Sequence, residues 1–180
     1  MKQRTVVQLA LAGIFAIGIG SAQTTVTVPD TTQSTTMTAE VSEQARVNVP
    51  AAATFTVTNI SGSTAASAVS VTIDNVVLAT ATKQLKVSLQ AAAAAFTPPI
   101  ALATTWAAGD VSWNAATWTS ATGAAGTLSD TAYTAVATCA ADSAACSTTG
   151  LTFTLAPKTT VKRSGNHTLA VTWKFESIGA

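Results

Sequence analysis

The sequence predicts an all-β fold, an antiparallel β-sandwich of about eight to ten strands. Two observations predict it. Short segments alternate bulky apolar residues with Thr, Ser or Lys, as strands with one buried face require. Clusters of Gly, Ser and Asn separate these segments, and such clusters are typical of turns. No internal repeat of fixed period occurs, so the pattern does not favour a solenoid or a propeller.

The alternation predicts strands in five segments, which are residues 54–58, 69–73, 85–89, 151–155 and 168–175. The second strand is expected to continue to Leu78 after a bulge at Asp74 and Asn75. The last strand is expected to form a hairpin with residues 159–163 through the turn at Gly165. Five consecutive alanines, at positions 91–95, predict a short helical or irregular crossover.

The N-terminus reads as an export signal. Lys2 and Arg4 precede an apolar run over residues 6–19, and Gly20-Ser21-Ala22 supplies the small residues of a cleavage site. We therefore expect a signal peptide over 1–22, an N-terminal arm over 23–39 and a β-sandwich domain over 40–180. No later apolar run has the length of a membrane span, so we expect a secreted protein on a bacterial cell surface.

Composition excludes some partners. Ala and Thr make up about 40% of the chain, and charged residues only 9%, against roughly 25% in ordinary domains. Without Lys2 and Arg4, seven basic residues face eight acidic ones, which gives a net charge of −1. Such a surface offers no attraction for nucleic acid, and it gives little charge repulsion between copies of the protein.

Cys139 and Cys146 are expected to form a disulfide, because paired cysteines at short spacing in an exported chain usually do. We expect this bond to clamp a local turn and not to hold the domain together. A metal site is not expected, since His167 is the only histidine and lies far from both cysteines in the sequence. No cofactor motif or nucleophile elbow occurs, and the aspartates mostly lie in turn segments, so no catalytic residue and no enzymatic activity are predicted.

Trp106, Trp113 and Trp118 fall within one short segment rich in small residues. They are expected either to fill the core or to stack against a surface glycan. The odd spacing of Trp113 and Trp118 would place them on opposite faces of an uninterrupted strand, unless residues 114–117 form a turn or bulge. The glycan interpretation predicts an alternative function, a secreted carbohydrate-binding or adhesive module.

The arm contains a second strand-like alternation, Thr24-Thr25-Val26-Thr27-Val28. An extended segment of this kind can add to an open sheet edge of another subunit, and head-to-tail addition produces filaments. We therefore predict self-assembly, with Thr24 to Val28 as the donor strand and residues 41–49 as its extension.

Asn59 and Asn166 begin Asn-x-Ser/Thr patterns, which are the acceptor pattern of N-glycosylation.

The general plan from Gln23 to Phe175 resembles that of bacterial pilin-type surface subunits. The resemblance rests on the export signal, the Thr- and Ala-rich strands and the arm. It implies an immunoglobulin-like sandwich and a structural role as the subunit of an extracellular filament or surface layer. Two features depart from chaperone–usher pilins, which place a disulfide near their first strands and a Tyr near the C-terminus. Here the cysteines come late, and the last strand ends in Trp173-Lys174-Phe175.

Overall fold

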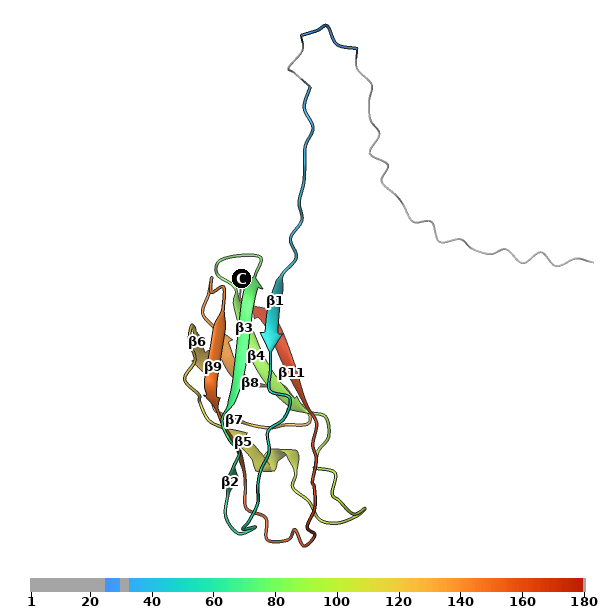
Figure 1. Cartoon of the computed structure of the whole chain (residues 1–180), viewed down its shortest axis with the longest axis vertical. Coiled ribbons are helices and arrows are strands. Elements are labelled where there is room, and N and C mark those ends of the chain that lie inside the picture. Colours follow the sequence, from blue (N-terminus) through green and yellow to red (C-terminus); the bar gives the residue numbers. More distant parts are fainter. Residues whose placement is uncertain (1–24, 30–32, 180) are drawn as a thin grey trace, which may run out of the picture. The chain divides into compact units, whose positions relative to one another are not determined.

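A computed structural model describes residues 25–29 and 33–179. The predicted signal peptide and Thr24 lie outside these residues. The chain divides into two units, Met1–Ala39 and Glu40–Ala180. The second unit contains every strand of the described chain, and these strands confirm the all-β fold (Figure 1). No helix among the described residues is long and apolar enough to cross a membrane.

The strands of the second unit form three antiparallel sheets, with orders β1-β3-β9, β2-β10-β5-β7 and β11-β4-β8-β6. The strands are β1 (Gln44–Asn48), β2 (Thr64–Ala65), β3 (Val69–Val77), β4 (Gln84–Ala91), β5 (Val111–Trp113), β6 (Ala121–Gly123), β7 (Gly126–Thr127), β8 (Thr134–Cys139), β9 (Cys146–Leu151), β10 (Phe153–Leu155) and β11 (Val171–Ile178), with one 3-10 turn, η1 (Ala108–Asp110).

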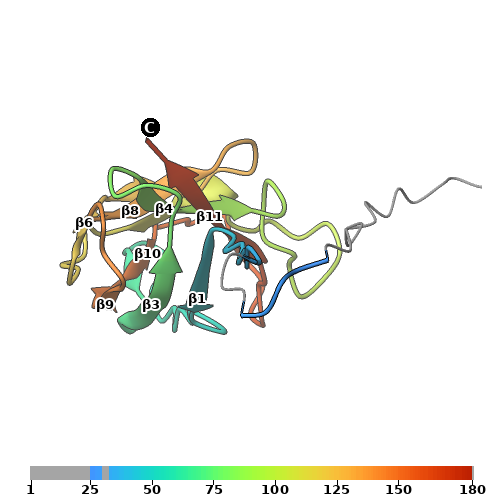
Figure 2. The same cartoon turned by 90° about the horizontal axis from the view of Figure 1, so that it is seen from above.

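The sheets pack as two layers, which Figure 2 shows from above. Strands β1, β3 and β9 belong to one layer and β11, β4 and β8 to the other. Alternate residues of β3 and β4 point inward, so that Val71, Ile73, Val87 and Leu89 have no exposed surface. This alternation is the period-two pattern of the sequence, and burial of these side chains is the main stabilising term of the domain.

Several predicted elements are confirmed, and two are wrong. The bulge at Asp74 and Asn75 appears as a register shift in the β1–β3 ladder. Residues 159–163 form no strand, so the predicted C-terminal hairpin does not exist; β11 pairs with β4 instead. Residues 54–58 are not a strand either. The alanine-rich segment that follows β4 is irregular and not helical, which agrees with one of the two conformations expected for it.

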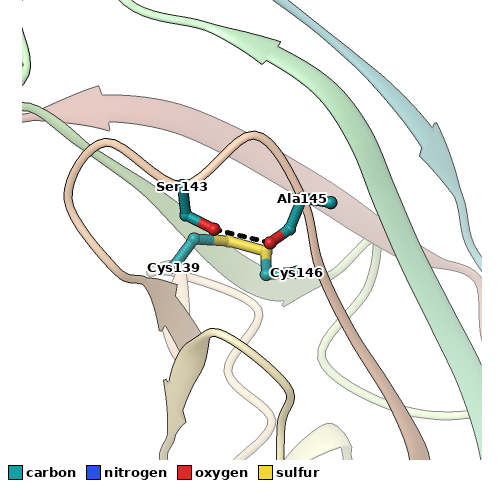
Figure 3. Close-up of a disulfide and its surroundings, with 4 residues drawn as sticks. All are labelled: Cys139, Ser143, Ala145 and Cys146. Atoms are coloured by element: carbon teal, nitrogen blue, oxygen red, sulfur yellow. Dashed lines mark hydrogen bonds between the residues drawn. A yellow bond between two sulfur atoms is a disulfide. The ribbon is translucent and has the colours of Figure 1, made fainter.

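The disulfide between Cys139 and Cys146 is present, and both cysteines are buried (Figure 3). It joins the end of β8 to the start of β9, with Cα atoms 5.9 Å apart. Because β8 and β9 belong to different layers, the bond ties the two layers together as well as closing the turn. This corrects the expectation that it clamps a local turn only. The Ser143 hydroxyl donates a hydrogen bond of 2.6 Å to the Ala145 carbonyl within that turn.

Candidate functional site

A groove of about 1110 Å³ opens along one side of the second unit. Its two rims are residues 50–57 after β1 and residues 161–171 at the start of β11. In Figure 1 the teal chain after β1 and the red chain before β11 both run towards the lower end of the domain. Core side chains line the space between them, including Phe96, Trp106, Val111, Leu128, Phe153 and Leu155.

β1 begins and β11 ends at the same end of the domain, which we call the arm end (Figure 1). There the Glu43 carboxylate accepts hydrogen bonds from the Ala79 N–H at 2.7 Å and the Lys83 Nζ at 3.0 Å. The same Oε1 atom also accepts a hydrogen bond of 3.3 Å from the Ser177 hydroxyl of β11. Glu43 therefore links the chain before β1 to the connection between β3 and β4 and to β11.

The first rim carries no backbone pairing. Residues 50–58 make no hydrogen bond with any other described residue. Phe55 and Val57 are nevertheless half-buried, while Thr54, Thr56 and Thr58 are exposed. The segment therefore keeps the inside–outside alternation of a strand although it has no neighbour in a sheet. Sequence reasoning found the alternation but missed the absence of a partner.

Among the described residues that line the groove, the basic side chains Lys162 and Arg163 and the imidazole of His167 all belong to the second rim. The His167 Nδ1 lies 2.7 Å from the Thr105 hydroxyl oxygen, and its Nε2 lies 3.2 Å from the Arg163 carbonyl oxygen. The imidazole also meets the Trp106 ring edge-on, at 5.2 Å between centroids. These contacts hold the rim against the domain.

The three tryptophans singled out by sequence lie in the core. Their exposed fractions are 5% for Trp106, 3% for Trp113 and 7% for Trp118. Trp106 and Trp113 each donate an Nε1 hydrogen bond of 3.0 Å to a backbone carbonyl, of Ala156 and Ala124 respectively. Residues 114–117 leave the strand after β5, which allows Trp113 and Trp118 to point inward together. None of the three presents a ring face to a sugar.

The predicted donor segment is exposed where the structure describes it. Thr25, Val26, Thr27 and Val28 belong to no strand, and the exposed fractions of Val26 and Val28 are 40% and 83%. The expected extension over 41–49 is wrong in its second half, because Gln44–Asn48 is β1 and pairs with β3. Asn59 and Asn166 are both exposed. Among the residues that the structure describes, no group of three His, Cys, Asp or Glu side chains could hold a metal ion.

Among the residues that the structure describes, three carboxylates have pKa values below their ordinary range. The hydrogen bond from the Ala79 N–H, followed by that from Lys83, lowers the pKa of Glu43. The Arg46 guanidinium lowers the pKa of Asp74 through its hydrogen bond. Burial raises the pKa of Asp110, but hydrogen bonds from Lys158 and from the Ala107 N–H outweigh it. All three side chains therefore stabilise the folded state in their charged form.

This arrangement predicts acid sensitivity. A carboxylate with a lowered folded pKa adds stability above its unfolded pKa and loses it as the pH falls through the folded value. The ordinary values are 4.5 for Glu43 and 3.8 for the two aspartates. We expect the urea midpoint to be constant from pH 7 to about pH 5 and to fall below that. Asp110→Asn should flatten the fall, and an unchanged profile in that variant would contradict the assignment.

No family model, curated protein or solved structure matches the chain.

Proposed function

We propose that this protein is an exported structural subunit of an extracellular filament or surface layer of a bacterium, assembled by β-strand addition between copies. The observation that carries the proposal is the groove whose first rim, residues 50–58, has backbone groups without a hydrogen-bond partner among the described residues. Unpaired N–H and C=O groups beside an apolar groove are what an added strand requires, because the strand supplies both hydrogen bonds and apolar side chains.

The donor in this proposal is Thr24 to Val28 of a second copy. Val26 and Val28 alternate with threonines, so a strand of this sequence presents two apolar side chains to one side and hydroxyls to the other. Both valines are exposed. Their burial in the groove would remove apolar surface from water, which favours association by about 25 cal/mol per Å² of apolar surface.

The start of β1 and the first rim lie towards opposite ends of the domain, which favours head-to-tail assembly. The chain that leads from the arm enters at the arm end, whereas the first rim follows β1 towards the opposite end (Figure 1). A copy that donates its arm therefore docks at the far end of its neighbour and leaves its own groove free. Such head-to-tail contacts do not close on themselves unless their rotation forms a ring, so they extend into filaments.

Deletion of residues 23–39 tests this function. Purified protein starting at Gln23 should form fibres visible by negative-stain electron microscopy, and the deletion variant should stay monomeric in sedimentation velocity. Val26→Ser with Val28→Ser should also reduce assembly, because the length of the arm is kept while its apolar side chains are lost. Ser34→Ala with Thr35→Ala is the matched control and should assemble normally. Fibres from the deletion variant, or a monomeric starting protein at high concentration, would contradict the proposal.

A further inference from the structure

The first rim has the composition of a strand but lacks the pairing of one. Its residues 54–58 read Thr-Phe-Thr-Val-Thr, and these β-branched and aromatic types favour strands. Phe55 and Val57 already face the groove and the core behind it. The backbone of residues 50–58 nevertheless has no hydrogen-bond partner among the described residues. For residues 54–58 to form a strand of a sheet, only a neighbouring strand is therefore missing.

The second rim is already tied to the chain behind it. Thr168 and Thr97 exchange two backbone hydrogen bonds, of 2.7 and 3.0 Å. The Ala170 carbonyl accepts a hydrogen bond of 2.9 Å from the Ala92 N–H, which continues the pairing of β11 with β4. An incoming strand would thus extend an existing ladder on this side. On the side of residues 50–58 it would create a ladder.

We propose that residues 51–58 are a β-strand that forms only on assembly, when the Thr24–Val28 segment of a second copy pairs with them. This inference rests on the proposed function and names its acceptor edge. Residues 29–43 separate the donor from β1 and can span up to about 50 Å when extended, which exceeds the roughly 30 Å length of the nine-residue β3. The arm can therefore reach into a neighbour that lies beyond its own domain.

A pair of neighbouring proline substitutions tests the acceptor edge. Successive N–H groups of a strand point to opposite edges, so only one of Ala53 and Thr54 can donate to an incoming strand. Neither N–H is bonded in the free subunit, and proline fits an extended backbone. Ala53→Pro and Thr54→Pro should therefore both fold with a melting temperature close to that of the unmodified protein. One of them should slow fibre formation at least tenfold, and the other should leave it unchanged, each serving as the control for the other.

Hydrogen exchange provides the second measurement. In the free subunit the amides of residues 51–58 should exchange rapidly. In fibres the alternate amides that face the incoming strand should become protected at least a hundredfold, while those on the opposite edge stay fast. The turn at residues 61–63 should exchange equally in both states. Fibres in which residues 51–58 stay unprotected, or in which neither proline acts, would overturn the acceptor edge and leave the filament function standing. If these amides are protected in a particle of monomer mass, pairing between copies is overturned, because the arm would then occupy the groove of its own subunit. A full-length protein that never assembles and never protects these amides would overturn both.

Discussion

Replacing Trp113 with alanine should lower the free energy of unfolding by about 3–5 kcal/mol, as measured by urea denaturation. Trp113 is 3% exposed at the end of β5 and packs edge-on against Phe153, with ring centroids 6.3 Å apart. Its ring also lies directly over Gly126, where a Cβ atom would collide with it. The neighbouring residues of this segment are small, so the space left by the indole cannot be filled by rearrangement, and a cavity remains.

Trp113→Phe is the matched control. It keeps an aromatic ring in the site but removes the 3.0 Å hydrogen bond from Nε1 to the Ala124 carbonyl. The loss should be smaller than for alanine, about 1–3 kcal/mol, because a half-buried acceptor is left without its donor. If alanine costs less than 1 kcal/mol, the assignment of Trp113 to the core is wrong.

Replacing both cysteines with serine should lower the free energy of unfolding by about 2.5 kcal/mol, since the unfolded chain regains the entropy of an eight-residue loop. The folded state should keep its layers, because the ladders of β8 and β9 do not depend on the bond. Both side chains are buried, so serine hydroxyls there add a further cost of desolvation.

A reducing agent separates the loss of loop closure from the cost of burying two serine hydroxyls. Dithiothreitol should destabilise the unmodified protein by roughly the loop-closure value of about 2.5 kcal/mol. It should have no effect on Cys139→Ser with Cys146→Ser. Equal urea midpoints for the unmodified protein with and without dithiothreitol would contradict a stabilising role for the bond.

The fold class follows from the sequence because strand burial imposes a period of two, and this period is local. Residues 69–73 and 85–89 show it plainly, and both lie in strands whose inward residues are fully buried. The hairpin predicted for residues 159–163 failed because turn residues at Gly165 mark a change of direction but do not choose a partner. β11 (Val171–Ile178) pairs instead with β4, which lies 80 or more residues earlier in the chain.

The candidate site could be predicted only in part. The alternation of Thr24 to Val28 is visible in the sequence, and so is the alternation of residues 54–58. The groove is not visible, because it depends on two rims separated by more than 100 residues and on the absence of pairing between them. An alternating pattern reports which face is apolar; it carries no information about whether a neighbouring strand exists.

The attachment of β1 has a mechanical consequence. The arm continues into a strand of five residues that pairs with β3 alone, so any pull on the arm acts along this ladder. Two contacts resist sliding there: the twin hydrogen bonds from Arg46 to Asp74, at 2.6 and 2.9 Å, and the Glu43 carboxylate held by Ala79 and Lys83. Tension along the strand loads the ladder in shear, so its bonds share the force and do not open one by one. Arg46 and Glu43 therefore resist the sliding of β1 along β3. Weakening either contact would lower the force at which β1 slips out of register.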